Sequence, residues 1–466
     1  MKQLQRIALL FFLSLLATGV SLKAQQDAPQ QVDTLKITLS EALEIALSEN
    51  PIIKIAEKEV ERTNYAKSEA IGNLIPSVSG SVSYQRALKD SPMFMSGDMI
   101  GMFQPNLPPG TVLPDVVAQR MGGLKNSYSA GISATIPIFS MGLYKNLQLA
   151  NLNIQVALES ARESKVSLKN EVEKAYYAIL LAQNSYEVVE MSFKSAEDNY
   201  ENVRLKFEQG KVAEFDKLRA EVQVSNVRPS FLQAKNVLQI VHLQLKMLMG
   251  LPLDIELVID ENLADYEEVY KNENLMAQGY DLANNTDLRK LNLQEDVLRK
   301  QIELQNTQRL PSLGAQFNYN FITQNSNFDF AHYIWYDSPS IGISLSIPIF
   351  NGLTLRNKDR QLKAGLSQLQ LQKEYRVSSL NLEVRNAINT MDNAAEQIEA
   401  NASIISQAEK AYDITKTRYD SGMGTLLELN DTEVALTQAR LNYNQAIYSY
   451  LVAKSDYIKI LGNSYQ

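Results

Sequence analysis

The sequence predicts a mixed α and β membrane protein built from a duplicated unit of one helix, two strands and a long helical hairpin. Three observations predict this fold class. They are an internal repeat, four short segments in which polar and apolar residues alternate, and two long segments with a seven-residue apolar repeat. Alternation with a period of 2 is typical of strands, whereas spacings of three and four residues are typical of helices.

The internal repeat aligns residues 50–84 with residues 285–319 at a constant offset of 235 and without a gap. Further matches follow in the same order: ISATIPIFSMGL with ISLSIPIFNGL, FEQGKVAEFDKL with YDSGMGTLLELN, and MLMGLP with IKILGN. A period of about two hundred residues is too long for a solenoid. The sequence therefore predicts a duplicated domain, with the first structural repeat at 37–262 and the second at 263–466.

A secretory signal peptide is expected before the first repeat. Lys2 and Arg6 precede an apolar run over 7–17, and LKA then offers a cleavage site of small residues. We assign 1–24 to the signal peptide and 25–36 to an N-terminal tail. Cleavage there removes three positive charges and changes the formal net charge from −8 to −11. The acidic balance argues against nucleic acid as a partner, and the lack of cysteine argues against disulfides or a lipid anchor.

Four strands are predicted from strict alternation, at about 76–86, 127–138, 312–322 and 340–350. Each is about ten residues long, which is enough to cross a bilayer when the strand is tilted. Their polar positions are small and uncharged, as suits a wet channel. Aromatic residues gather near the strand ends, as in an interfacial belt: Tyr84, Tyr128, Phe321, Tyr333, Trp335 and Tyr336. A soluble β-sandwich is the alternative to a membrane barrel.

Four strands cannot close a barrel, since single-chain barrels begin at about eight strands. An open edge in lipid leaves backbone groups without hydrogen-bond partners, so several copies must share one barrel. Two chains would give eight strands and a filled interior, whereas three would give twelve strands and room for a channel. We predict a homotrimer with a twelve-stranded β-barrel.

Two long helical hairpins are predicted at 142–249 and 352–461. In the first, small or apolar residues alternate at spacings of four and three, which is typical of a coiled-coil seam: Leu168, Val172, Ala175, Ile179, Ala182, Tyr186, Val189, Phe193, Ala196, Tyr200, Val203 and Phe207. The second hairpin repeats the seam, with Asn401 and Thr415 interrupting it. Pro229 is expected to kink or divide the first returning helix. A fibrous or signalling coiled coil is the alternative interpretation.

The order of these elements resembles the TolC family of outer-membrane efflux proteins over nearly the whole mature chain. LSEALEIALSENP at 39–51 is similar to the opening helix of that family. IPIF followed by glycine, found twice, is similar to its exit from strand into long helix. The Phe/Tyr-x-x-Gly turns followed by an acidic residue are similar to its periplasmic hairpin ends.

The resemblance implies a passive exit duct of a tripartite efflux or type I secretion system in the cell outer membrane. The barrel would continue as a long α-helical tunnel through the periplasm. The implied partners are outer-membrane lipid, a periplasmic adaptor protein and an inner-membrane transporter of the RND, ABC or MFS type. No catalysis and no cofactor are implied.

The resemblance also implies roles for residues at the hairpin ends. Glu428 and Asp431 match carboxylates that ring the periplasmic aperture, where three copies would attract cations and raise some of each other's pKa values. Both residues could equally be exposed carboxylates, and Asp431 could be a helix-start residue. Asp216 and Tyr419 match positions that join the two hairpins and form a candidate aperture latch.

The basic partner of that latch is missing from this sequence, because the matching position is Gly424. We expect any latch to be weaker, or to be built through Arg418 or Lys211. 

The turns themselves are candidate adaptor contacts, namely Gly210, Lys211, Gly422 and Met423. Backbone geometry alone would explain the two glycines equally well.

Little in the sequence supports an enzyme. His242 and His332 are the only histidines, and neither has a partner at metal-ligand spacing. The run Met93, Met95, Met99 and Met102 could form a soft-metal site, but apolar packing in a loop is the favoured interpretation. Two other functions stay open: an oligomeric coiled-coil surface scaffold or adhesin without transport, and a general porin.

Overall fold

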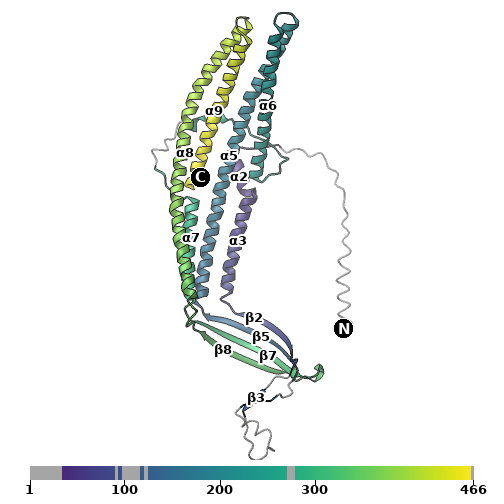
Figure 1. Cartoon of the computed structure of the whole chain (residues 1–466), viewed down its shortest axis with the longest axis vertical. Coiled ribbons are helices and arrows are strands. Elements are labelled where there is room, and N and C mark those ends of the chain that lie inside the picture. The colour runs from purple at the N-terminus through teal and green to yellow at the C-terminus, as the bar shows by residue number, and fades with distance from the viewer. Residues whose placement is uncertain (1–33, 90–92, 97–115, 120–123, 270–278, 463–466) are drawn as a thin grey trace, which may run out of the picture.

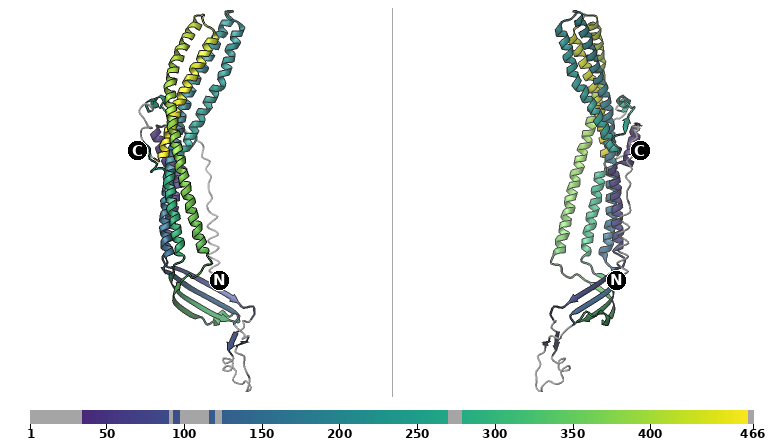
Figure 2. Two further views of the ribbon diagram at one scale, coloured as in Figure 1. Left: turned by 60° about the vertical axis from the view of Figure 1, so that its left-hand side comes forward. Right: turned by 90° about the vertical axis from the view of Figure 1, so that its right-hand side faces the viewer.

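The computed structural model describes residues 34–89, 93–96, 116–119, 124–269 and 279–462. The expected signal peptide lies outside the described residues. The protein is elongated, with long helices that run from two hairpin ends down to a sheet (Figure 1). Two further views show the helices as a curved layer above the tilted sheet (Figure 2).

The main sheet has four antiparallel strands in the order β2-β5-β7-β8. Their bounds are Ser77–Arg86, Asn126–Phe139, Ser312–Asn325 and Tyr336–Ser346. Strands β2 and β5 come from the first repeat, and β7 and β8 come from the second. Within the described residues, β2 and β8 each have one neighbouring strand in this sheet, so both present a free edge.

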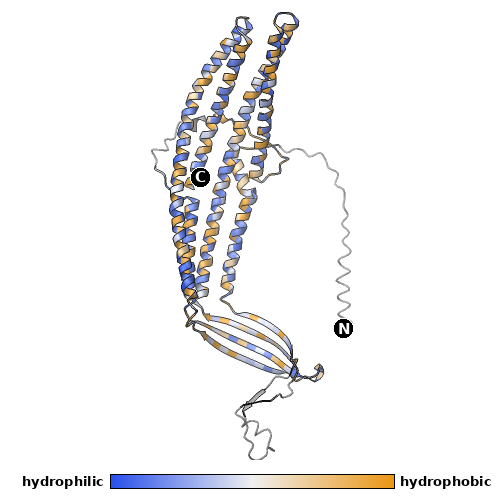
Figure 3. Cartoon of the chain, in the orientation of Figure 1, coloured by the Kyte–Doolittle hydropathy of each residue, from blue (hydrophilic) through white to orange (hydrophobic). Residues whose placement is uncertain are grey.

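The register places like residues side by side across all four strands. Val78 pairs with Ala134, which pairs with Phe317, which in turn pairs with Ile341. On the opposite face, Ser79, Ser133, Asn318 and Ser340 form another row. Two serine pairs in such rows share hydrogen bonds of 2.8 and 2.7 Å, Ser79 with Ser133 and Ser83 with Ser129. The sheet therefore has one apolar and one polar face, and Figure 3 shows the alternation along each strand.

The expected bounds of the fourth strand, 340–350, are wrong by four residues at each end. Strand β8 begins at Tyr336 because Tyr336 still pairs with Ile322, and it ends at Ser346. Pro348 lies just beyond that end, and proline has no backbone N–H to donate to a ladder. Pro339 lies inside β8 opposite Tyr319 of β7, and it has no backbone N–H to donate to a neighbouring strand.

The connection between β2 and β5 contains a small hairpin that the sequence did not predict. Strands β3 (Met93–Ser96) and β4 (Val116–Gln119) pair antiparallel within it. This hairpin lies beyond the main sheet, at the end remote from the helices (Figure 1).

Four helices form the two long hairpins. Helix α5 (Met141–Glu208) returns as α6 (Glu214–Met249), and α8 (Thr354–Asp420) returns as α9 (Leu426–Leu461). At 1.5 Å per residue, α5 and α8 are each about 100 Å long. Helix α6 is continuous through Pro229, so this proline does not divide the helix, and the expected kink stays a prediction.

The predicted seam is confirmed along α5, where the smaller members of the series are buried: Leu168, Val172, Ala175, Ile179, Ala182, Val189, Ala196 and Val203. The larger aromatic members are only partly buried and contact neighbouring rings. Phe193, for example, stacks on Phe231 of α6 with ring centroids 5.0 Å apart. The second seam is buried from Leu380 to Ile398 and becomes partly exposed beyond Asn401.

Short helices extend the returning helices toward the sheet. Helix α3 (Pro51–Gly72) continues the line of α6, and α7 (Thr286–Thr307) continues the line of α9 (Figure 1). Each junction has a left-handed glycine, Gly250 at φ 71° and Gly462 at φ 68°. A Cβ on Gly250 would lie 2.9 Å from the carbonyl oxygen of Glu49, so only glycine allows this approach.

An asparagine completes each junction in the same way. Asn50 caps α3 by accepting a hydrogen bond from Ile52 N–H at 2.7 Å, and its amide donates to the carbonyl of Leu248 at 2.6 Å. Asn285 caps α7 by accepting from Leu288 N–H, and it donates to the carbonyl of Ile460 at 2.6 Å. One side chain thus satisfies the N-terminus of one helix and the C-terminus of another.

A small layer packs beside these junctions. Strand β1 (Thr34–Lys36) pairs in parallel with β6 (Glu256–Val258), next to α2 (Leu39–Glu49) and the 3-10 helix η1 (Leu263–Val269). Residues 34–36 are therefore not part of an N-terminal tail, since they form hydrogen bonds with the segment that follows α6. The main apolar core lies at this level and joins both repeats, from Ile53 through Leu180 to Ile398 and Tyr450.

We expect Gly462→Ala to destabilise the protein by about 1–3 kcal/mol, because alanine must adopt a left-handed conformation against the carbonyl of Asn284. Chemical denaturation followed by circular dichroism measures the change. Gly365→Ala in α8 is the matched control, since a Cβ there meets no atom within 4 Å. It should stabilise the helix by about 0.5–1 kcal/mol. Equal stability of the two variants would contradict the junction's role.

Candidate functional site at the ends of the helical hairpins

The first hairpin end is a glycine turn between α5 and α6. Gly210 has a φ of 70°, and its N–H donates to the carbonyl of Phe207 at 2.8 Å. The N–H of Lys211 donates to the carbonyl of Lys206 at 2.9 Å. These two bonds form the Schellman motif that ends a helix at a left-handed glycine. Nothing lies within 4 Å of a Cβ on Gly210, so the turn is open to solvent on that side.

The second hairpin end repeats the motif. Gly422 has a φ of 74° and donates to Tyr419, while Met423 N–H donates to the carbonyl of Arg418 at 2.8 Å. The side chain of Met423 is 71% exposed at the outermost point of the turn. The backbone requirement explains both glycines, and it leaves the role of Lys211 and Met423 in partner binding as a prediction.

Gly424 packs so closely on the end of α8 that a larger residue would disturb the turn. A Cβ at this position would lie 3.0 Å from the backbone nitrogen of Tyr419 and 3.2 Å from Cβ of Arg418. Gly424 N–H also donates to the carbonyl of Arg418 at 3.0 Å. The missing basic residue noted in the sequence is therefore consistent with the tight packing of this turn.

The side chain of Arg418 is hydrogen-bonded within the same turn. Its guanidinium donates to the carbonyl of Met423 at 3.4 Å. Of the two cations that the sequence offered as substitutes in the latch, Arg418 thus closes its own turn. Lys206, which sequence analysis did not select, is the cation that approaches Tyr419, with Nζ 5.3 Å from the ring centroid.

Tyr419 lies where the two hairpins meet. It packs against a small apolar cluster of Val203 from α5, Ala220 from α6 and Leu426 from α9. Partial burial raises the pKa of the Tyr419 hydroxyl, and the negative charges of Asp216 and Asp420 raise that pKa further. The structure therefore brings Asp216 and Tyr419 together, and apolar packing between the hairpins surrounds them. Of the three residues that Tyr419 packs against, Val203 was predicted from the sequence, as a member of the seam. Ala220 and Leu426 were not predicted.

Glu428 has a defined structural role at the start of α9. Thr425 is the N-cap, and it accepts a hydrogen bond from Glu428 N–H at 3.2 Å. The carboxylate of Glu428 in turn accepts from Thr425 N–H at 3.0 Å, which completes a capping box. Asp431 lies in the next turn of the same helix and is exposed. The sequence analysis offered a helix-start role for Asp431 as an alternative to the aperture, whereas the structure gives that role to Glu428.

Two further carboxylates are buried between α5 and α9: Glu173 beside the main core, and Glu433 eight residues after the N-cap Thr425. Glu173 accepts a hydrogen bond from Ser455, and burial raises the pKa of its carboxyl group above the usual range. Burial also raises the pKa of Glu433, and one oxygen of that side chain has no partner among the described residues. Neither residue had a sequence signal: Glu173 lies between Val172 and Ala175 without belonging to the predicted seam, and no periodic series was predicted along α9.

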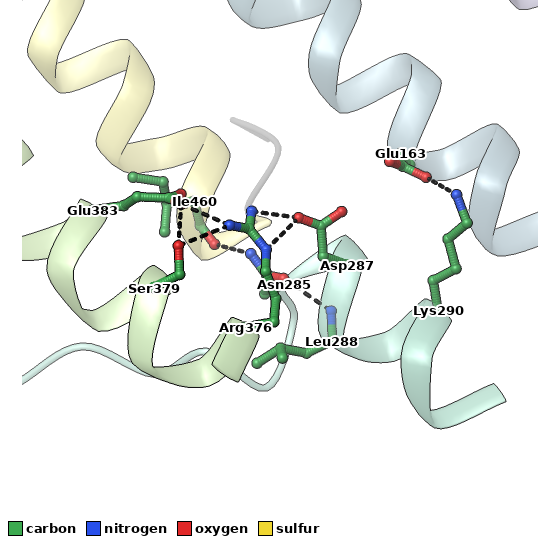
Figure 4. Close-up of polar contacts among 9 residues, drawn as sticks. All are labelled: Glu163, Asn285, Asp287, Leu288, Lys290, Arg376, Ser379, Glu383 and Ile460. Atoms are coloured by element: carbon green, nitrogen blue, oxygen red, sulfur yellow. Dashed lines mark hydrogen bonds and ion pairs between the residues drawn. The ribbon is translucent and has the colours of Figure 1, made fainter. Parts of the chain in front are cut away.

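A second polar region lies at the junction of α7, α8 and α9 (Figure 4). Arg376 of α8 donates to Asp287 at 2.5 Å and to Glu383 at 2.6 Å, beside the Asn285 cap. Lys290 forms an ion pair of 2.8 Å with Glu163 of α5. A cavity of about 670 Å³ adjoins these groups and is lined by residues of α5, α7, α8 and α9. These contacts connect the second repeat to the first at the level of the core.

The other candidate residues do not form a site. His332 is exposed and contacts Asp329 at 2.7 Å. Burial and the charge of Lys246 lower the pKa of His242. Within the described residues, no three His, Cys, Asp or Glu side chains lie close enough together to hold a metal ion. The methionine run lies partly outside the described residues.

The chain matches the family model described as "Outer membrane efflux protein" over residues 42–251 and 281–463. It is 24% identical over 334 residues to the alkaline protease secretion protein AprF of Pseudomonas aeruginosa, covering 70% of this chain and 68% of AprF. It is also 24% identical over 329 residues to the outer membrane protein TolC of Vibrio cholerae, covering 70% of this chain and 74% of TolC.

Two solved structures have a similar fold. The CmeC outer membrane channel of Campylobacter jejuni superposes with a TM-score of 0.68 at 18% identity, covering 91% of this chain and 85% of CmeC. The outer membrane protein VceC of Vibrio cholerae also gives a TM-score of 0.68, at 15% identity, covering 92% of this chain and 97% of VceC. At these identities the likeness shows the fold alone.

The chain therefore belongs to the outer membrane efflux protein family. It is an efflux channel of the outer membrane, in a family of transport proteins rather than enzymes. The predicted resemblance, function and location are confirmed, and the alternative of a scaffold or adhesin has no support. In the part of the chain that the structure describes, no helix is both long and apolar enough to cross a bilayer.

We expect Glu173→Gln to stabilise the protein at pH 7. The raised pKa of Glu173 means that folding favours its neutral form, so the stability from this group is present below pH 4.5 and is lost as the pH rises through the raised pKa. Glutamine imitates the neutral form and can still accept a hydrogen bond from Ser455. Thermal unfolding followed by circular dichroism should show a higher midpoint than wild type at pH 7.

The difference between Glu173→Gln and wild type should shrink as the pH approaches 4.5. Glu171→Gln is a control on an exposed position of the same helix, and it should leave the midpoint unchanged at both pH values. A thermal midpoint for Glu173→Gln equal to or lower than that of wild type at pH 7 would contradict the claim that ionised Glu173 destabilises the folded protein.

Proposed function

We propose that three copies of this chain form one twelve-stranded barrel in the outer membrane, continued by an α-helical tunnel in the periplasm. The observation that carries the proposal is the pair of free edges on β2 and β8. With four antiparallel strands, β2 and β8 run in opposite directions, so β8 of one copy can pair antiparallel with β2 of the next. Such pairing leaves no edge open to lipid.

The two faces of the sheet support the same assembly. The apolar face carries rows such as Val78, Ala134, Phe317 and Ile341, which suit contact with acyl chains. The opposite face carries Ser, Asn, Gln and Gly, whose small uncharged groups suit a water-filled channel. Val82 and Ile341 are more than 80% exposed in the single chain, which is costly in water and favourable in lipid.

Helices α6 and α8, at the two margins of the helical layer, also have apolar side chains that a neighbouring copy would cover. Helix α5 contacts α6 and α3 on one side and α9 and α7 on the other, and α8 packs on α7 and α9. Helices α6 and α8 are therefore the two margins of the helical layer. Both expose large apolar side chains along their length: Phe215, Leu218, Val222, Leu232 and Ile240 on α6, and Leu371, Tyr375, Leu382, Ile404 and Ile414 on α8.

The proposed activity is passive conduction from a periplasmic adaptor and an inner-membrane transporter to the outside. The names of similar proteins include protease secretion for AprF and toluene efflux for TtgC of Pseudomonas putida. The hairpin ends are the parts farthest from the sheet, which makes Lys211 and Met423 the proposed adaptor contacts. Single-channel conductance of the mature protein in a planar bilayer tests the channel, and folded oligomers that give no current would overturn it.

The proposed gate is a ring of Glu428 and Asp431 from three copies at the periplasmic end. Glu428 lies in a capping box, so its backbone position is fixed and its charge can be removed without losing the cap. Glutamine at the third helical position can make the same hydrogen bond to Thr425 N–H. Charge and structure can therefore be separated at this residue.

We expect the double variant Glu428→Gln, Asp431→Asn to lose cation selectivity, because up to six carboxylates leave the constriction. Reversal potentials in a salt gradient measure the selectivity. The control is Glu57→Gln, Glu69→Gln, which removes two exposed carboxylates from α3. If the Glu428→Gln, Asp431→Asn variant is as cation-selective as the control, the hypothesis of a carboxylate ring is wrong.

We also propose that the cluster around Tyr419 holds the two hairpins together when the channel is closed. Tyr419→Ala should raise the resting conductance because it removes a ring that packs between the hairpins and against Lys206. Tyr419→Phe keeps the ring and should leave the resting conductance near that of wild type. Asp216→Ala tests the acidic member of the predicted latch, and it should also raise the resting conductance.

An unchanged resting conductance in Tyr419→Ala would show that packing at the tip does not close the channel. An unchanged conductance in Asp216→Ala alone would remove Asp216 from the latch and leave the apolar cluster.

A further inference from the structure

The loop between β7 and β8 folds back onto the apolar face of the sheet at the end remote from the helices. Tyr84 and Tyr128 belong to this face by the alternation of their strands, and their rings stack with centroids 4.7 Å apart. Phe330 and Tyr333 of the loop cover Tyr128, with ring centroids 5.4 and 5.7 Å from it. The loop therefore lies on the side of the sheet that faces lipid in the proposed barrel.

A buried amide fixes the position of this loop. Asn126 is completely buried, and its Nδ2 donates to the carbonyl of Asn327 at 3.1 Å. Its Oδ1 accepts from the hydroxyl of Tyr84 at 3.0 Å and from Arg86 at 3.4 Å. Tyr333 also donates to the carbonyl of Asn327, at 2.5 Å. One backbone carbonyl thus holds the loop to β5 through Asn126 and to the ring cluster through Tyr333.

Arg86 is a cation at this margin of the apolar face. It follows Tyr84 by two residues on β2, so it points to the same face, just beyond the aromatic row. Its guanidinium carbon lies 5.2 Å from the ring centroid of Phe328. Among the described residues Arg86 forms no ion pair. Its guanidinium contacts the side-chain oxygen of Asn126 and the ring of Phe328.

This arrangement suits an anion at the depth of lipid headgroups. Guanidinium groups bind phosphate in a fork geometry, and stacking on an aromatic ring holds the group without neutralising its charge. Three large aromatic side chains of the same loop are also substantially exposed: Phe328, Phe330 and Trp335. Such side chains prefer the boundary between acyl chains and headgroups, where a phosphate lies beside them.

We propose that Arg86 and the loop 327–336 form a binding site for the phosphate of lipid A, the phosphorylated glycolipid of the outer leaflet. The proposal rests on the barrel described above, since it needs the apolar face to meet lipid and this end of the sheet to lie in the outer leaflet. It assigns the site to one lipid because the end of the sheet opposite the periplasmic helices meets that leaflet.

The chain offers its own probe for the test. Trp335 is the only tryptophan in the sequence and lies within the loop. Its fluorescence therefore reports on this site alone, in the intact oligomer purified in detergent. Titration with lipid A should give a saturable blue shift, because the indole leaves water as the lipid binds.

Arg86→Gln should weaken lipid A binding about fivefold, which corresponds to the loss of one cation–phosphate contact near a membrane surface. Arg228→Gln removes an exposed cation from α6, far from the sheet, and should bind like wild type. Phe330→Ser, which loosens the loop but keeps Arg86, should weaken binding as well. If Arg86→Gln fails to assemble, Arg86→Lys tests the site, since it keeps the charge but not the fork.

Binding of phosphatidylglycerol as tightly as lipid A would overturn the assignment to lipid A. An unchanged affinity in both Arg86→Gln and Phe330→Ser would overturn the site itself. Failure of the barrel has a separate readout, because wild-type protein would then form no conducting oligomers in a planar bilayer.

Discussion

The end-to-end meeting of helices is the interaction on which the shape of this protein depends. Helices α6 and α9 end at Gly250 and Gly462, and α3 and α7 begin at once beside them. At both places an asparagine amide donates to one helix end while its oxygen caps the other. Without these contacts, one backbone N–H and one carbonyl at each junction would need other partners in a region that also holds the main core.

The junctions also explain how two repeats become one body. Arg376 and Lys290 connect the second junction to α8 and α5, and β1 with β6 packs beside the first. Above this level the hairpins are joined mainly along α5 and α9, where Glu173 and Glu433 are buried. Buried carboxylates thus lie between the repeats, and within the second hairpin Arg440 of α9 donates to Glu409 of α8 at 2.8 Å. The raised pKa values of Glu173 and Glu433 consequently make the contact between the repeats depend on pH.

Periodicity predicted the strands and long helices because their apolar positions repeat many times. It could not predict β1, since three residues do not define a period, nor the ends of β8, where pairing with Ile322 decides. Duplication located the turns at Gly210 and Gly422. The sequence analysis missed that Glu428 closes a capping box, although Thr425 followed three residues later by Glu428 is the sequence signature of that motif. The contact of Tyr419 with Val203 joins segments over two hundred residues apart, which no local pattern encodes.

The two hairpin ends are alike in backbone and different in surface. Each is a left-handed glycine in a Schellman motif, but the next residue is Lys211 in one and Met423 in the other. A ring of three chains would therefore present six ends in alternating order, one cationic and one apolar. A protein that docks onto this ring would therefore contact two kinds of hairpin end. The subunits of a hexameric partner would bind in two inequivalent ways. A trimeric partner could bind one kind of end and leave the other free.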